Sequence, residues 1–160
     1  GVKNIIMLTG DTKQKAEMIA NELGIDEVRA ELLPQDKAKI VKELMESGKK
    51  VAFVGDGIND APALISAHVG ISMSRGADIA KATADISLLK DDIMAVVEAK
   101  EYANKTMNLI NNNFNATVGI NSCILAGATF GIFSPIVTAV LHNGTTIGLL
   151  FNSIKGVNIK

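Results

Sequence analysis

The sequence predicts an α/β fold with a mostly parallel sheet and flanking helices, followed by a pair of uncharged helices. Short apolar runs alternate with segments of helical periodicity over about residues 1–106. No Asp, Glu, Lys or Arg occurs between residues 114 and 154. The 160 residues, 48% of them hydrophobic, suffice for a domain with a buried core, and the net charge of −1 gives no reason to expect a nucleic-acid partner.

The first elements are two strands, each followed by a helix. The apolar run 2–8 predicts a buried strand that ends at Thr9-Gly10-Asp11. Residues 12–23 carry apolar side chains at helical spacing, and Gly24 stands where a helix ends. A short strand is expected over 27–33, and Pro34 opens a helix that runs to residue 46.

The alternation continues to about residue 89. Strands are expected at 50–54, 69–73 and 86–89, with helices at about 60–67 and 78–82 between them. Strands that are separated by helical segments form a parallel sheet covered by helices, so ligands are expected beyond the carboxyl ends of the strands.

Four polar residues stand at or just past the ends of predicted strands: Thr9, Asp11, Asp56 and Asp60. We expect them on one edge of the sheet. Carboxylates that are brought together repel one another unless a cation neutralises them, and Mg²⁺ prefers oxygen ligands. The sequence therefore indicates a magnesium site at this edge.

The same edge has features of a phosphate site. Gly55 and Gly57 allow a sharp turn and leave room for a bulky anion, while the hydroxyl of Thr9 and the ammonium of Lys37 can bind phosphoryl oxygens. Each feature alone has an ordinary explanation, because Asp-Gly is a common turn and a single lysine is usually solvated. Their occurrence together, in order after successive strands, favours a phosphate site.

Three motifs at these positions resemble those of P-type ATPases: MLTGD (residues 7–11), PQDK (34–37) and VGDGINDAPAL (54–64). They are similar to the second half of the phosphorylation domain, which belongs to the haloacid-dehalogenase-like superfamily. The stretch VGISMSRGADIAKATADISLL (69–89) is also similar and suggests the heavy-metal-transporting, type IB branch. The resemblance implies a partial Rossmann-like sheet.

The resemblance also implies roles for individual residues. Asp56 would bind Mg²⁺, Asp60 would support the site and couple it to movement, and Asn59 would orient the loop. The implied catalytic set is Thr9, Gly10, Asp11, Lys37, Asn59 and Asp60, with Gly55 and Gly57 lining the site. The family also needs a nucleophilic aspartate in a DKTGT motif, which this sequence does not contain, so we expect no ATP turnover by this chain alone.

The chain therefore resembles the C-terminal portion of a pump. Its start without an initiator Met suggests a piece of something longer. The expected partners are the rest of the pump, namely the nucleotide-binding domain, which would bind most of the ATP, the actuator domain and the earlier membrane helices.

Residues 107–160 are expected to form the last two membrane helices, at about 114–133 and 135–154, each long enough to cross a lipid bilayer. Ser134-Pro135 suits a tight connection, and lysines flank the pair on both sides. The positive-inside tendency then places residues 1–106 and the C-terminus in the cytoplasm, with a multi-pass protein in the cell membrane. The alternative is a buried helical pair in a soluble protein.

Polar side chains within these helices suggest a site for a transported metal. Asn121 lies in the first helix, and His142 and Thr145 lie in the HNGTT stretch of the second. Neutral imidazole binds transition metals, and amide or hydroxyl oxygens add ligands. For an isolated histidine a hydrogen bond between the helices is the ordinary explanation, whereas the HNGTT motif favours a metal ligand. By resemblance, Ile120 replaces the tyrosine of copper pumps, which favours a divalent metal over Cu⁺.

We thus expect part of an ATP-driven transition-metal exporter that works through an aspartyl-phosphate. Two alternatives stay open. One is a soluble haloacid-dehalogenase-like phosphatase, and the other is a non-catalytic membrane subunit from a truncated pump.

Overall fold

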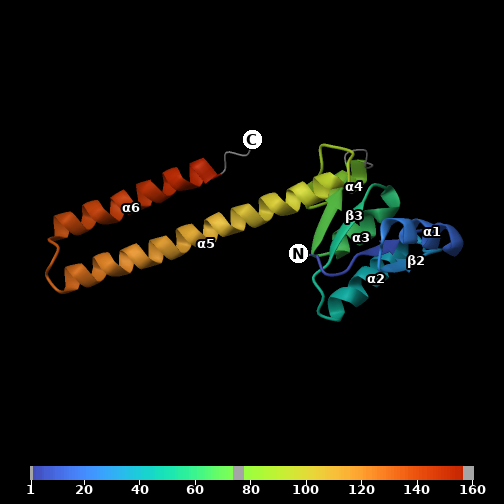
Figure 1. The fold of residues 1–160 in the computed structure, drawn as a ribbon, viewed down its shortest axis with the longest axis horizontal. Coiled ribbons are helices and arrows are strands. Elements are labelled where there is room, and N and C mark those ends of the chain that lie inside the picture. The colour runs from blue at the N-terminus through green and yellow to red at the C-terminus, as the bar shows by residue number, and fades with distance from the viewer. Residues whose placement is uncertain (1, 74–77, 157–160) are drawn as a thin grey trace. The chain divides into compact units, whose positions relative to one another are not determined.

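A computed structural model describes residues 2–73 and 78–156, with Ile79 described by its backbone alone (Figure 1). Residues 74–77 of the motif at 69–89 and the C-terminal residues 157–160, expected in the cytoplasm, lie outside the described residues. The chain divides into two compact units, Gly1–Val96 and Val97–Lys160, and each is treated by itself.

In its described residues the first unit alternates strands and helices as far as Ser87, as expected. Its elements are β1 (Ile6–Leu8), α1 (Lys13–Leu23), β2 (Glu27–Arg29), α2 (Pro34–Glu46), β3 (Ala52–Gly55), the 3₁₀ turn η1 (Ile58–Asp60), α3 (Ala61–Ser66), β4 (Val69–Ser72), α4 (Asp78–Thr83) and β5 (Ile86–Ser87). Helix α2 has the predicted bounds, whereas every strand is shorter than predicted.

All strand pairings in the described residues are parallel, which confirms the predicted sheet type. The strands nevertheless form two sheets, β1–β2 and β3–β4–β5, in place of one. In the second sheet β3 and β4 pair in parallel, from Ala52 opposite Val69 to Gly55 opposite Ser72, so their carboxyl ends lie at the same edge of the sheet.

The core of this unit lies between α2, α3, α4 and the second sheet. Val41, Phe53, Ala63, Leu64 and Ala80 are buried and pack together there. The backbone of α3 also approaches β4 closely at Gly70, where an added Cβ would lie 2.7 Å from the carbonyl oxygen of Leu64. This tight packing fixes the segment between β3 and α3, which carries the VGDGIND motif.

The second unit is helical. Helix α5 (Met94–Thr129) begins in the first unit and continues through the second, and α6 (Pro135–Gly156) follows it. Within the second unit the two helices run antiparallel, side by side (Figure 1). The turn between them ends α5 with Gly131 at φ 71°, and the amides of Gly131 and Ile132 donate to the carbonyls of Ala128 and Gly127.

The predicted helical hairpin is therefore present, and α6 begins at the predicted Pro135. Among the described residues, however, no helix combines the length and the apolar character that crossing a membrane requires. Polar side chains lower the apolar character: α5 carries charges in its first third and several asparagines, and α6 contains Asn143 and Asn152. The prediction of two membrane-spanning helices is not confirmed.

Candidate functional site

The segment Gly55–Asp60, here called the GDGIND turn, joins β3 to α3. Asp56 directly follows β3 and is exposed, while Asp60 ends the 3₁₀ turn and is buried, with only 8% of its surface exposed. The amide of Gly57 donates to Asp60 Oδ2 at 3.4 Å, and the amide of Asp60 donates to the Gly57 carbonyl at 3.1 Å. The two acids of the turn thus have different environments: one faces solvent and the other is held inside.

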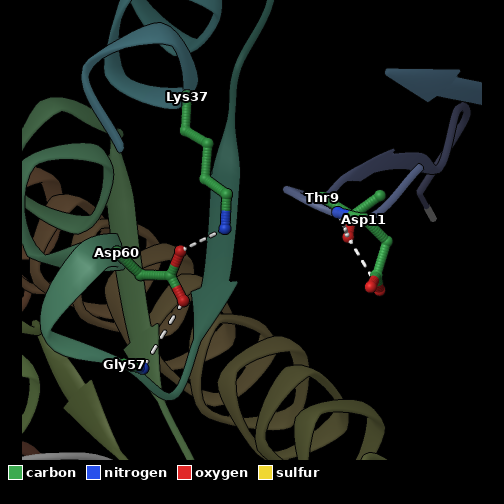
Figure 2. A network of polar contacts seen from close by, with 5 residues as sticks. All are labelled: Thr9, Asp11, Lys37, Gly57 and Asp60. Atoms are coloured by element: carbon green, nitrogen blue, oxygen red, sulfur yellow. Dashed lines mark hydrogen bonds and ion pairs between the residues drawn. The ribbon is translucent and has the colours of Figure 1, made fainter. Parts of the chain in front are cut away.

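Lys37 from the first turn of α2 reaches the GDGIND turn (Figure 2). Its Nζ donates to Asp60 Oδ1 at 2.7 Å, and the two side chains are only 16% and 11% exposed. Ion pairs in such partly desolvated positions interact more strongly than pairs at the surface. The pair therefore ties α2 to the GDGIND turn and holds an ammonium group beside it.

Gly55 is required by the close approach of Asp60. A Cβ at Gly55 would lie 2.7 Å from Asp60 Cβ, which is closer than two carbon atoms can pack. At Gly57 an added Cβ would lie 3.7 Å from Asp60 Oδ2, an ordinary contact. Gly55, the first glycine of the motif, thus makes space for Asp60. This packing is enough to explain why a glycine stands at position 55, without invoking a bound ligand.

The segment Thr9–Asp11, the TGD turn, follows β1. Thr9 Oγ1 accepts from the amide of Asp11 at 3.1 Å and donates to Asp11 Oδ2 at 3.3 Å. Lys15 from the first turn of α1 donates to Asp11 Oδ1 at 3.0 Å. This hydrogen bond, the charge of Lys15 and the bond from Thr9 lower the pKa of the Asp11 carboxyl below 3.8, so Asp11 is ionised at neutral pH.

The backbone of the TGD turn is also held from outside. The amide of Leu32 donates to the Thr9 carbonyl at 3.1 Å, and the amide of Glu31 donates to the Asp11 carbonyl at 2.9 Å. A Cβ at Gly10 would lie 3.3 Å from the carbonyl oxygen of Leu32, a tight contact. The loop after β2 thus fixes the conformation of the turn.

The structure joins the predicted site residues into two hydrogen-bonded groups. Lys37, Asp60 and Gly57 form one, and Thr9 and Asp11 form the other, with no bond drawn between the groups (Figure 2). Asp56 and Asn59 are exposed. In the parts of the chain that are described, no three His, Cys, Asp or Glu side chains gather as a metal site would require.

In the second unit, the predicted metal-site residues Asn121 and His142 are in contact. His142 Nδ1 lies 3.1 Å from Asn121 Oδ1, across the two helices. Because a carboxamide oxygen only accepts, the imidazole Nδ1 is the donor in this pair. Thr145 is half-buried and donates to the Leu141 carbonyl of its own helix at 2.8 Å. The hydrogen bond between helices that the sequence left as an alternative for His142 is present.

Comparison with known proteins finds relatives that match both units of the chain. Residues 1–68 match the family model described as haloacid dehalogenase-like hydrolase. The zinc-exporting P-type ATPase of Mycobacterium marinum is 41% identical over 97% of this chain, and the manganese-exporting P-type ATPase of Mycobacterium leprae is 42% identical over 97%. The chain is a homologue of heavy-metal P-type ATPases.

A solved structure agrees with this assignment. The crystal structure of a zinc-transporting PIB-type ATPase in the E2.Pi state matches 96% of the chain with a TM-score of 0.88 and 35% sequence identity. The chain spans about a fifth of the length of the curated P-type ATPases, 21% and 22%, and covers 25% of the solved chain. It therefore corresponds to part of such a pump.

One contributor to the P-type ATPase motifs was missed in the sequence. Lys15 contacts Asp11, and its position four residues later on a helix that starts at Lys13 is a recognisable signal for an ion pair. Lys15 lies outside the motif, which ends at Asp11. Asp36, in contrast, lies inside the PQDK motif and accepts from the amide of Leu33 at 2.9 Å, which caps α2 and so fixes the start of the helix that carries Lys37.

Proposed function

We propose that this chain supplies the Mg²⁺ and phosphate side of the phosphorylation site, together with part of the ion path, in a pump that exports a divalent transition metal. One observation carries the proposal: the similarity to zinc- and manganese-exporting P-type ATPases extends over 97% of the chain and thus through both units. On this basis residues 1–106 are the C-terminal half of the cytoplasmic phosphorylation domain, and 107–160 are the last two membrane helices.

The phosphate-site roles follow from the first unit. Lys37 holds its positive charge at the GDGIND turn, where it neutralises phosphoryl oxygens, and Asp60 keeps Lys37 in place. Thr9 and Gly10 present a hydroxyl and a backbone amide after β1, and the ionised Asp11 orders Thr9. Asn59 stands exposed on the GDGIND turn, where it orients the loop toward a phosphate.

The residues fit a Mg²⁺ ion that is shared with a phosphate. Mg²⁺ is usually bound by one or two carboxylates, several waters and phosphate oxygens, so a single exposed carboxylate after β3 is a suitable donor. Asp56 would be that ligand, because its side chain is exposed directly after β3. When bound, the ion would neutralise the charge that develops on the transferred phosphoryl group.

Phosphoryl transfer needs groups that this chain does not contain. The sequence has no DKTGT motif, so the nucleophilic aspartate must come from another part of the pump, as must most of the ATP contacts. We expect the purified chain to form no ATP-dependent, hydroxylamine-sensitive phosphoenzyme. Such labelling of the isolated chain would contradict the assignment of the nucleophile to the missing part.

We also propose that the α5–α6 hairpin lies in a lipid bilayer, with residues 1–106 and the C-terminus on the cytoplasmic side. Residues 114–154 carry no Asp, Glu, Lys or Arg, and the large apolar side chains Phe114, Leu125, Ile136 and Leu150 are 60–76% exposed in this chain. Asn113 and Asn152 bond to each other across the hairpin, and Asn113 also bonds to Ser153, which reduces the cost of placing these side chains in lipid. A monodisperse full chain in plain buffer, without detergent, would contradict this.

His142 is the proposed ligand of the transported metal. Its Nδ1–H donates to Asn121, which leaves Nε2 as the ligand atom, in the manner of imidazoles oriented by a hydrogen bond on the other nitrogen. Asn121 then orients His142, and Thr145 lies about one helical turn further along α6. A neutral imidazole with neutral oxygen neighbours suits divalent transition metals such as zinc.

The test uses a complete pump that carries this C-terminal part. His142→Ala should reduce metal-stimulated ATPase activity at least tenfold, because the ligand is lost, while phosphorylation from inorganic phosphate stays within twofold of the wild type. The matched control is His68→Gln in the first unit, where the His68 side chain accepts from the amide of Val51 at 3.3 Å and its Nε2 lies 3.4 Å from Lys50 Nζ. Equal loss of both reactions in His142→Ala would indicate a folding role.

The match of residues 1–68 to hydrolases also favours a second function, that of a soluble phosphatase. It leaves residues 69–160 without a role, although the pumps match nearly the whole chain. Release of phosphate from small phosphomonoesters by the isolated chain would support the phosphatase.

A further inference from the structure

A second polar cluster joins α5 and α6 away from His142. Asn113 Oδ1 accepts from Asn152 Nδ2 at 2.7 Å, and Asn113 Nδ2 donates to Ser153 Oγ at 2.8 Å. Ser153 Oγ in turn donates to the Leu149 carbonyl at 3.0 Å. Both halves of one carboxamide are therefore used in bonds to the opposite helix, and we call this cluster the Asn113 clamp.

The Asn113 clamp and the His142 contact lie in the same antiparallel register. Asn113 precedes Asn121 by about two helical turns, or about 12 Å along α5 at 1.5 Å per residue. On α6 the order is reversed: Asn152 and Ser153 follow His142 by about three turns, or about 15–17 Å. A slip of one helix by a single turn, about 5.4 Å, would break the clamp and the His142–Asn121 contact together. The two contacts are therefore geometrically coupled.

Of the three consecutive asparagines at 111–113, Asn113 is the one whose side chain bonds to α6. Asn111 and Asn112 are exposed, whereas Asn113 is half-buried against α6. Nearby, a Cβ at Gly156 would lie 2.5 Å from Leu109 Cδ2, so the two helices also approach closely at this end. Apolar contacts tolerate sliding, but a carboxamide that donates and accepts across the interface accepts only one register.

We propose that Asn113 is a positioning residue that sets the register of the α5–α6 hairpin and thereby holds His142 Nδ1 against Asn121. The inference rests on the proposed function only for the consequence that a metal is bound. The contact itself can be measured without metal, so the two ideas fail separately.

The experiment is ¹⁵N imidazole NMR of the full chain in detergent, with His68→Gln so that His142 is the sole imidazole. In this background His142 should show protonated Nδ1 and unprotonated Nε2, and Asn121→Ala should abolish that signature. Asn113→Leu should abolish it equally, whereas the matched control Asn112→Leu should leave it unchanged. An unchanged His142 signature in Asn113→Leu would overturn the proposal.

Two further measurements keep the test decisive. If Asn113→Leu loses its helical circular dichroism, Ser153→Ala is the deciding variant, because it removes a single bond of the clamp. A folded Ser153→Ala protein with a partly lost His142 signature supports the proposal, and an unchanged signature refutes it.

Zn²⁺ titration is the second measurement. Asn113→Leu should weaken binding about threefold to tenfold, the worth of one or two interhelical bonds. If His142→Ala leaves Zn²⁺ binding unaltered while the NMR results hold, the metal assignment is wrong and the register proposal stands.

Discussion

The ion pair between Lys37 and Asp60 offers a sharp test of how the GDGIND turn is held. Replacing Lys37 with Met keeps the length of the side chain and removes its charge, which leaves the Asp60 carboxylate buried with the amide of Gly57 at 3.4 Å. At 2.7 Å and an effective dielectric constant of about 20, the lost attraction is about 6 kcal/mol before solvation is counted. Removal of one partner from a buried pair costs about 3–5 kcal/mol, and we expect the lower end because both side chains keep some exposure.

The assay is urea unfolding of the full chain in detergent, followed by the methyl NMR signals of the buried Val41 and Leu64. A loss of about 3 kcal/mol lowers the unfolding midpoint by about 1–3 M for a slope of about 1–3 kcal/mol per M. The control is Lys39→Met on the same helix, where the ammonium lies 4.0 Å from Glu43 and is 76% exposed. Such surface pairs contribute less than about 1 kcal/mol.

The double variant Lys37→Met with Asp60→Asn separates charge from packing. It should be more stable than Lys37→Met alone, because no uncompensated charge stays buried. If Lys37→Met and Lys39→Met shift the midpoint equally, the argument that desolvation strengthens the Lys37–Asp60 pair is refuted.

Three further predictions concern single positions. Gly55→Ala should cost about 1–3 kcal/mol of unfolding free energy, since its Cβ would overlap Asp60, and urea unfolding measures it. Lys15→Met should raise the pKa of the Asp11 carboxyl toward 3.8, which a ¹³C carboxyl titration measures. Because folding lowers this pKa, the ionised Asp11 stabilises the fold above pH 3.8, and this contribution is lost as the pH falls through the lower pKa of the folded state. Gly131→Ala should cost about 1 kcal/mol in thermal unfolding of the hairpin, because φ is 71°.

Each of these has a matched control. Gly57→Ala meets only an ordinary contact and should be nearly neutral. Lys13→Met breaks an exposed pair with Glu17 and should leave the titration of Asp11 unchanged. Gly144→Ala adds a Cβ in open space within α6 and should stabilise the helix by up to about 1 kcal/mol, the reverse of the effect at Gly131. Equal effects of a variant and its control would contradict the stated cause.

Helix boundaries were predictable where a residue fixes the backbone. Pro34 begins α2 as expected, because its fixed φ suits the first helical position, and Gly24 ends α1 at φ 65°. Strand lengths were not predictable in the same way. The predicted strand includes residues 2–5, but these contain Lys3 and Asn4 and have no partner strand among the described residues. The length of a strand depends on its neighbours as well as on its own sequence.

The start of α5 and the arrangement of the site needed the structure. A helix from Met94 was not expected, although Asp92, whose Oδ1 accepts from the Met94 amide at 2.8 Å, is a typical capping residue. The sequence placed Asp56 and Asp60 together at one edge, but periodicity could not show that Asp60 turns inward to Lys37 while Asp56 stays exposed. The meeting of Asn121 and His142 depends on helix register, which a sequence of small and apolar residues leaves open.

The closed end of the hairpin has a consequence for the substitutions that relatives can carry. The ring of Phe133 lies directly on the backbone of α5 at Gly127, where an added Cβ would come within 2.4 Å of the ring. An alanine at 127 is therefore compatible only with a smaller residue at 133. We expect these two positions to covary among homologous pumps, with the loss of glycine at the first accompanied by the loss of the aromatic ring at the second.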